Sequence, residues 1–474
     1  MDPEPFRSAH AGDLRRQDAG SAVRLAGWVN ARRDHGGVVF VDLRDASGLV
    51  QVVLNPGDEP ATPEVLHGLR NEYCLAVSGV VRERMEGTAN PDLDTGEVEV
   101  VAHSLDVLSP ALTLPFQIDD REDVDEARRL QYRYLDLRRP RLAANLRARS
   151  DAIKAMRRVL DRGGFLEIET PTLVASTPEG ARDLLVPSRL RPGQFYALPQ
   201  SPQLFKQLLM IGGVERYYQV ARCYRDEDFR SDRQIEFTQL DLEGAFWGQD
   251  DVLAVLEEVA SEVVRDLRDV ELPRPFLRMT YAEAIARYGT DKPDLRFGME
   301  IEDLSALFAA TEFRAFRGVL DGGNVIRGFN AGGLGLSRAG LDGVVSKAQD
   351  LGAKGLVWMV VEDDGSLRSP VSKFLSEEET SGVVSALGGA PGDVLLLVAD
   401  DAATTAHVLG QIRLELGRPE GHDDLAFVFI VDFPMFDRVQ DGSLTPAHHP
   451  FTAPADVTDM RERPATSLSR SYDL

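Results

Sequence analysis

The chain has 474 residues, a formal net charge of −24, 43% hydrophobic residues and 27% charged residues. This length predicts about two to four domains, and the composition is that of an ordinary globular protein. No apolar run is long enough to span a bilayer, and the first residues contain no apolar signal region. Cys74 and Cys223 lie far apart in sequence, which excludes a disulfide scaffold and a cysteine-rich zinc site. We therefore expect a cytoplasmic protein without a membrane partner, while the acidic charge leaves room for a local basic face that binds nucleic acid.

Residues 1–108 predict a five-stranded barrel. A helix is expected over 63–71, between the third and fourth strands, and this order is typical of an OB-fold, a scaffold often used for single-stranded nucleic acid. Phe40 alternates with Val39 and Val41, and the pattern leaves open whether its ring faces outward to stack a base or lies in the core. The expected strands are 23–29, 37–43, 50–54, 75–81 and 97–102.

The remaining chain alternates between helical and strand-like segments. Residues 109–135 are interpreted as a linker, and a following amphipathic helix is expected to stop at Gly163 and Gly164. Residues 136–296 predict a sheet with flanking helices, residues 297–424 a separate α+β block, and residues 425–474 a return of β-type sequence. The strand-like runs are 165–169, 195–198, 217–224, 234–243 and 427–433, with a helix over 202–210.

Eight motifs follow one another along nearly the whole chain. They are residues 27–34 (GWVNARRD), 40–45 (FVDLRD), 132–140 (YRYLDLRRP), 177–183 (TPEGARD), 199–206 (PQSPQLFK), 223–228 (CYRDED), 237–241 (FTQLD) and 448–451 (HHPF). Together they resemble the bacterial-type aspartyl-tRNA synthetases, a class II aminoacyl-tRNA synthetase family. The resemblance implies an α+β multidomain protein: an anticodon-binding OB-fold over 1–108, a catalytic domain on a mostly antiparallel sheet over 136–296 and 425–474, and an inserted α+β domain over 297–424.

The implied reaction activates L-aspartate with ATP to aspartyl-adenylate and transfers the aspartyl group to tRNA(Asp). Joining a carboxylate to a phosphate requires cations, because the two anions repel each other. Arg225 opens a turn between two strand-like runs and can aim its guanidinium at a phosphate, although it could instead pair with Asp226 or Asp228. By resemblance Arg225 is catalytic and binds both aspartate and ATP. The other implied ATP-binding residues are Asp226, Glu227 and Gln234.

Lys206 is the second implied catalytic residue. It is placed to meet the side-chain carboxylate of aspartate, and Gln203 lies on the same helix face. By resemblance, Glu179, Gln203 and Asp241 hold the ammonium group, and His448 contacts the substrate. The structural alternatives are that Glu179 is a helix-start carboxylate and that Lys206 belongs to a solvated face.

The adjacent His448 and His449 do not predict a zinc site, because neighbouring histidines in an extended chain point in different directions and no third ligand is near. The metal that the resemblance implies is Mg²⁺ on the ATP phosphates, with Glu243 as the metal-binding carboxylate and Asp241 beside it.

The resemblance of the barrel motifs also implies which residues bind the anticodon and which tRNAs are charged. Arg33, Phe40 and Gln51 match anticodon-binding positions of the family. His35 and Gly87 match the form found in synthetases that charge both tRNA(Asp) and tRNA(Asn), although His35 could be only a turn residue. Misacylated tRNA(Asn) would then require a partner amidotransferase, and no DNA partner is expected.

Residues 165–171 resemble the class II dimer-interface motif, so a homodimer is expected. Members of the family continue past the position of Leu474 with a third class II motif, for which we find no match in this sequence. An alternative function is therefore a catalytically inert, truncated tRNA-binding relic.

Overall fold

The computed structural model describes residues 6–55, 57, 60–177, 179–229, 233–418, 424–439 and 442–474. The chain forms two compact units, Met1–Ser150 and Asp151–Leu474. The finer division into five parts stays a prediction.

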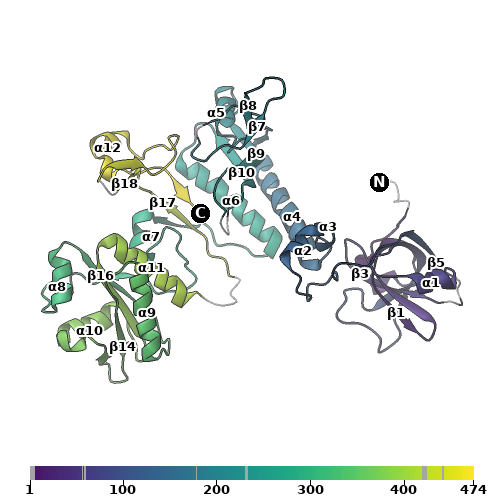
Figure 1. The fold of residues 1–474 in the computed structure, drawn as a ribbon, viewed down its shortest axis with the longest axis horizontal. Helices are drawn as coiled ribbons and strands as arrows, with labels where there is room; N and C mark the ends of the chain where they lie inside the picture. The colour runs from purple at the N-terminus through teal and green to yellow at the C-terminus, as the bar shows by residue number, and fades with distance from the viewer. Residues whose placement is uncertain are drawn as a thin grey trace. The chain divides into compact units, whose positions relative to one another are not determined.

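The first unit contains a closed five-stranded barrel with the order β1-β2-β3-β5-β4, shown in purple in Figure 1. All neighbouring strands are antiparallel except β3 and β5, which are parallel. Alternate residues point inward, and Leu25, Val41, Leu75 and Val100 belong to the buried core. The expected strands are thereby confirmed. Their bounds are β1 (Ala22–His35), β2 (Val38–Arg44), β3 (Leu49–Leu54), β4 (Cys74–Glu83) and β5 (Val98–Ser109).

A short helix, α1 (Pro63–Gly68), lies between β3 and β4, as the sequence predicts. Thr62 begins it by accepting a hydrogen bond from the backbone N–H of Val65, and Pro63 occupies its first turn. The helix ends three residues before the predicted bound because Leu69 adopts an extended conformation.

The predicted linker over 109–135 is only partly irregular. It contains the end of β5 and two short helices, α2 (Glu126–Gln131) and α3 (Arg133–Asp136). The side chain of Asp125 caps the first of these helices. The long helix α4 (Pro140–Arg162) follows, and it stops where predicted, with Gly164 in the left-handed conformation at φ 74°.

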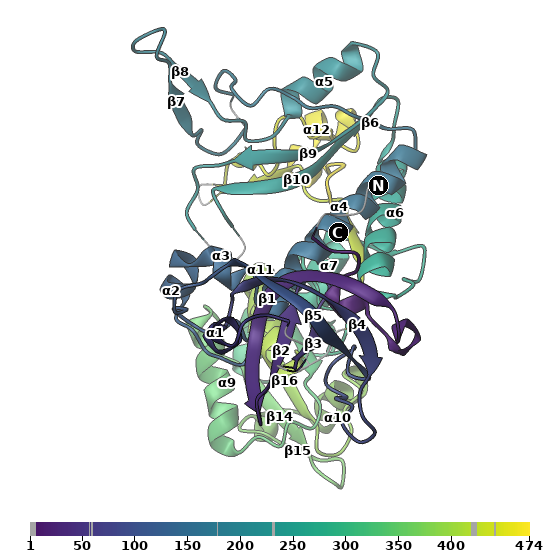
Figure 2. The ribbon, with the colours of Figure 1, turned by 90° about the vertical axis from the view of Figure 1, so that its right-hand side faces the viewer.

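The second unit begins with a three-stranded sheet of order β10-β9-β6, in which β9 and β10 are antiparallel and β6 is parallel to β9. Val159 of α4, Phe165, Tyr218 of β9 and Val259 of α6 pack together in its core. The hairpin of β7 and β8 extends away from β9 and β10 (Figure 2). The bounds are β6 (Leu166–Glu167), β7 (Leu185–Pro187), β8 (Phe195–Ala197), α5 (Gln203–Ile211), β9 (Arg216–Tyr224), β10 (Glu236–Gly244) and α6 (Gln249–Arg268).

The block predicted over 297–424 contains a five-stranded sheet of order β12-β13-β16-β14-β15. Leu341 of α9 and Val408 of α11 belong to the core on one face, and Phe316 of α8 and Val383 of α10 to the core on the other. The bounds are β12 (Glu302–Asp303), α8 (Arg314–Asp321), β13 (Val325–Asn330), α9 (Arg338–Asp350), β14 (Val357–Val361), β15 (Leu367–Arg368), α10 (Glu377–Ala386), β16 (Val394–Asp400) and α11 (Ala402–Gly417).

The remaining strands form a second three-stranded sheet of order β11-β17-β20 and a hairpin of β18 and β19. The β-type run predicted over 427–433 is the centre of this sheet. No helix in the described part of the chain is long and apolar enough to cross a membrane. The bounds are β11 (Leu277–Thr280), α7 (Tyr281–Tyr288), β17 (Val428–Val431), β18 (Phe436–Arg438), β19 (Leu444–Pro446), α12 (Val457–Glu462) and β20 (Tyr472–Asp473).

Candidate functional site

Lys206 lies at the centre of a charged cluster between α5 and β10. Its Nζ donates to Asp241 Oδ1 at 2.7 Å and to the Leu242 carbonyl at 3.3 Å, and it lies 3.4 Å from Glu243 Oε2. Asp241 and Glu243 are two residues apart on β10 and therefore share one face of the strand. Lys206 is only 9% exposed, so the alternative of a solvated face is wrong.

Asp241 keeps one acceptor available inside this cluster. Its Oδ2 is buried and has no hydrogen-bond partner among the described residues. Burial raises the pKa of Asp241, and the neighbouring Lys206 ammonium only partly opposes that rise. A donor group of a ligand would satisfy this oxygen and favour the ionised form.

Glu179 and Gln203 lie close to the same cluster. Glu179 accepts hydrogen bonds from Ser201 Oγ at 2.6 Å and from Thr177 Oγ1 at 3.1 Å. It lies in a loop, so the alternative of a helix-start carboxylate is wrong. Gln203 is the first residue of α5, three positions before Lys206 and on the same side of the helix.

Arg225 follows β9 directly. Its guanidinium lies over the ring of Phe237, 5.1 Å from the centroid, and its backbone N–H donates to the Ile235 carbonyl. The acidic neighbours pair with other arginines: Asp226 lies 3.8 Å from Arg182, and Glu227 lies 3.3 Å from Arg233. Gln234, also predicted to bind ATP, is exposed.

The buried thiol of Cys223 marks the point where these residues converge. Burial raises its pKa to about 11, and the charged groups that act on it are Arg225, Asp241, Glu179 and Lys206. These four side chains come from four separate motifs. The fold thus gathers two cations and two carboxylates around one buried position.

His448 lines a cavity of about 710 Å³ in the second unit, together with Asp291, Arg470 and Tyr472. Burial raises the pKa of Tyr472, and the charge of Glu243, which belongs to the Lys206 cluster, adds to that rise. The His448 ring packs edge-on against Phe433, and its Nε2 lies 3.1 Å from the Pro434 carbonyl. In the described residues no contact joins His448 to the Lys206 cluster, and no group of three or more His, Cys, Asp or Glu side chains is arranged to hold a metal.

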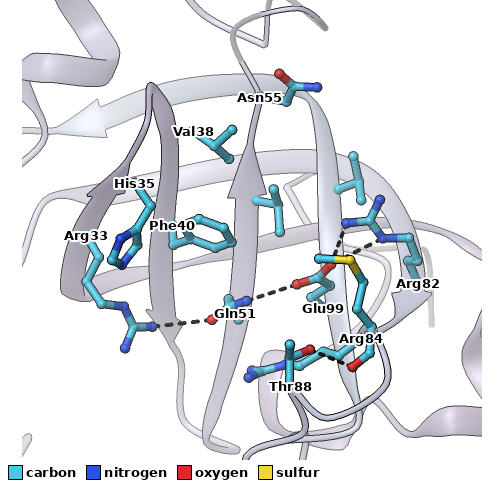
Figure 3. Close-up of a pocket in the computed structure, with 13 residues that line it drawn as sticks. Arg33, His35, Val38, Phe40, Gln51, Asn55, Arg82, Arg84, Thr88 and Glu99 are labelled. Carbon is cyan, nitrogen blue, oxygen red and sulfur yellow. Dashed lines mark hydrogen bonds and ion pairs between the residues drawn. The ribbon is translucent and has the colours of Figure 1, made fainter.

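A second candidate site lies on the outer face of the barrel (Figure 3). A cavity of about 590 Å³ is lined by Arg33, His35, Phe40 and Gln51 among others. Phe40 is half-buried and faces outward, whereas Val39 and Val41 are buried, so the alternative of a core Phe40 is wrong. The His35 ring packs edge-on against the Phe40 ring, with the two ring centroids 5.9 Å apart.

Polar side chains on the five barrel strands are linked across the floor of this pocket. Arg33 donates to Gln51 at 3.3 Å and to Asp42 at 2.7 Å. Gln51 in turn donates to Glu99 at 2.9 Å, and Glu99 also accepts from Arg82 (Figure 3). The pocket therefore presents an aromatic face beside ordered donors and acceptors, which suits an unstacked base.

Several residues that line the barrel pocket are not among those predicted from the sequence. They include Asn55, Arg82, Arg84, Thr88 and Glu99. Glu99 is 5% exposed and lies on β5. A buried carboxylate amid apolar neighbours in a barrel strand was the signal that could have found it. Gly87 is exposed at φ 80°, one residue from Thr88, and is not itself part of the lining.

Comparisons with known proteins match a family to each of the two parts of the chain that carry these sites. Residues 125–474 match the family of class II tRNA synthetases (D, K and N), and residues 23–108 match an OB-fold nucleic acid binding domain. An aspartate--tRNA(Asp/Asn) ligase from Saccharopolyspora erythraea is 51% identical, covering 99% of this chain and 78% of that protein. One of the same name from Moorella thermoacetica is 53% identical, covering 99% and 79%.

Among solved structures, the asparaginyl-tRNA synthetase from Pyrococcus horikoshii, complexed with asparaginyl-adenylate, shares the fold. The TM-score is 0.51 at 20% identity, over 88% of this chain and 99% of that one. With a family match over residues 125–474 and relatives above 50% identity, the chain belongs to the class II tRNA synthetases of the D, K and N group.

Proposed function

We propose that this chain is an aspartate–tRNA ligase that activates L-aspartate with ATP and charges tRNA(Asp) and tRNA(Asn). The buried Lys206 ammonium, 2.7 Å from Asp241 Oδ1, carries this proposal, because together with the Asp241 Oδ2 that has no partner among the described residues it offers a cation and an acceptor to one small ligand. Relatives at about 50% identity over nearly the whole chain bear the name of such a ligase, which favours this function over an inert tRNA-binding relic.

In the proposed reaction, the Lys206 ammonium binds the side-chain carboxylate of aspartate. The free Oδ2 of Asp241, with Glu179 and Gln203, receives the substrate ammonium group. Arg225 neutralises the α-phosphate, so that an oxygen of the α-carboxylate can attack phosphorus and expel pyrophosphate. A ribose hydroxyl of the tRNA then attacks the adenylate carbonyl and releases AMP. His448 is proposed to contact the substrate only if the segment that carries it moves towards the cluster.

The carboxylates beside Lys206 fit Mg²⁺ only in part. Asp241 and Glu243 are oxygen donors, which Mg²⁺ prefers, but both lie within 3.4 Å of the Lys206 ammonium, which repels a dication. Asp241 is therefore a poor metal ligand. Glu243, at the longer distance and partly exposed, could hold Mg²⁺ together with ATP phosphates, where the ion would neutralise charge on the phosphates.

The barrel pocket is proposed to bind the anticodon. Phe40 offers a stacking face, and Arg33 and Gln51 offer polar groups to a base edge. His35 and Gly87 are proposed to permit charging of tRNA(Asn). An amidotransferase would then convert the misacylated product.

Replacing His35 with Leu is expected to lower charging of tRNA(Asn) about tenfold while charging of tRNA(Asp) changes less than about twofold. The imidazole supplies a donor and an acceptor beside Phe40, and Leu supplies neither. The measurement is initial-rate charging of each tRNA. The matched control is His67→Leu, which changes an exposed histidine on α1 that does not line this pocket. Equal effects on both tRNAs would contradict the role in discrimination.

A homodimer is also proposed. Phe165 is buried against Trp247. The residues that follow it in the proposed interface motif, and the β7–β8 hairpin, expose large apolar side chains that a second copy would cover. These exposed side chains are Leu166, Leu173, Leu185, Leu190 and Phe195. The cytoplasmic location predicted from the sequence is the one expected of a tRNA ligase.

The proposed function is tested by aspartate-dependent ATP–pyrophosphate exchange with the purified chain. Exchange with L-aspartate but not with L-asparagine or L-lysine is the expected result, because Lys206 provides a cation for a substrate carboxylate. Binding of tRNA without binding of aspartate or ATP would favour the inert relic instead.

A further inference from the structure

Gln200 is a buried amide just before α5, and it is only 1% exposed. Its Nε2 donates to the Ala181 carbonyl at 2.8 Å and to Asp183 Oδ1 at 2.5 Å. The backbone N–H of Ala181 donates back to Gln200 Oε1 at 3.0 Å. All of these side-chain hydrogen bonds therefore go to one short loop, residues 179–183.

Segment 179–183 carries Glu179 into the charged cluster. The charge of Glu179 contributes to the raised pKa of Asp241, and Glu179 accepts a hydrogen bond from Ser201 Oγ just before α5. Gly180 adopts φ 101°, and the segment forms neither helix nor sheet of its own. Its position must therefore come from side-chain and bridge contacts.

The other anchor of this segment lies on the side of the proposed ATP-binding loop. The Asp226 N–H donates to the Arg182 carbonyl at 3.0 Å, and Arg182 Nε donates to the Asp226 carbonyl at 3.3 Å. Gln200 and Asp226 thus both hold the segment, and the Ser176 hydroxyl also donates to Asp183 Oδ2. Gln200 and the adjacent Ser201, whose Oγ donates to Glu179 at 2.6 Å, both belong to the chain segment that leads into the helix of Lys206.

We propose that Gln200 is a positioning residue that latches segment 179–183, so that Glu179 is held ready for the ammonium group of the substrate. This inference rests on the proposed function. Gln200 acts through Ala181 and Asp183, because these two residues are the partners in all of its side-chain hydrogen bonds described above. Its loss removes three hydrogen bonds to the loop and leaves the ion pair between Lys206 and Asp241 in place.

The test compares Gln200→Ala with Asn330→Ala in the full chain. Asn330 is a matched control because its amide makes the same set of bonds elsewhere: to the Gly388 carbonyl, to Asp393 Oδ2, and from the Gly332 N–H. In Gln200→Ala, hydrogen exchange in peptides spanning 179–183 should accelerate about tenfold or more, and the aspartate dissociation constant measured by calorimetry should rise about tenfold. The ATP dissociation constant should change less than about twofold, and Asn330→Ala should leave all three unchanged.

Gln200→Glu separates positioning from simple packing. It keeps the side-chain shape and the acceptor for the Ala181 N–H, but it places a carboxylate oxygen where Nε2 donated to Asp183. We expect the same loss of aspartate affinity as in Gln200→Ala. Wild-type affinity in either variant, or unchanged exchange in the segment, would overturn the latch. Absence of aspartate binding by the wild-type chain would instead overturn the proposed function, and the exchange data would still report on the latch itself.

Discussion

Replacing Lys206 with Met is expected to reduce aspartate-dependent ATP–pyrophosphate exchange by about a thousandfold. Lys206 is the cation that the proposed mechanism places against the substrate side-chain carboxylate, and Met has a similar length without the charge. The substitution of Lys206 also changes the environment of Asp241. Burial already raises the pKa of that carboxyl with Lys206 at 2.7 Å, and without the ammonium the pKa rises further. A higher pKa favours the neutral form of Asp241, which attracts the substrate ammonium group less strongly, so one substitution weakens binding at both ends of aspartate.

The measurement is exchange at saturating ATP over a range of aspartate concentrations, with direct aspartate binding by calorimetry. Lys154→Met is the control, because Lys154 is an exposed lysine on α4 whose salt bridge with Asp151 lies on the surface. It should retain wild-type exchange. If Lys206→Met bound aspartate as tightly as the wild type, Lys206 would serve only to neutralise Asp241 and Glu243.

The barrel could be predicted from sequence because its signal is local. Alternation along β2 separates Val39 and Val41 from Phe40, and the turn residues mark the strand ends. What the local pattern does not contain is the pairing of β3 with β5, which places Val53 beside Val101 and lets Gln51 reach Glu99. The sequence could single out Glu99 only as a carboxylate within an apolar strand, because its partners in the pocket come from distant strands.

In the candidate active site, too, some residues could be predicted from the sequence and others could not. Lys206 and Gln203 could be predicted to share a face, because three residues on one helix place them there. Gln200 looks like one more polar residue in its motif, and its burial results from segment 179–183 folding over it. The distance between His448 and Lys206 is likewise a tertiary property that no spacing in the sequence contains. The short helices α2 and α3 were not predicted, because the acidic, proline-containing stretch before them is typical of a linker and the predicted linker extends to residue 135.

Replacing Phe40 with Ala is expected to weaken tRNA binding about ten- to a hundredfold, since stacking on an aromatic side chain contributes about 1–3 kcal/mol per base. The change removes the only aromatic carbocycle in the described lining of the barrel pocket and the surface on which the His35 ring packs. The fold should tolerate it. Phe40 is half-buried on the outer face of β2, whereas the core contacts of that strand are made by Val39, Val41 and Leu43.

Equilibrium binding of tRNA(Asp) and of its anticodon stem–loop, at one fixed salt concentration, measures the loss. Phe40→Leu keeps an apolar side chain without an aromatic face and should behave like Phe40→Ala, whereas Phe40→Tyr should keep most of the affinity. Phe246→Ala is the control, because Phe246 is a 95% exposed phenylalanine of the second unit. Exchange measured without tRNA should be unchanged in every variant, since the proposed aspartate site lies in the second unit. Wild-type affinity in Phe40→Leu would mean that burial of apolar surface, and not stacking of a base, holds the anticodon in this pocket.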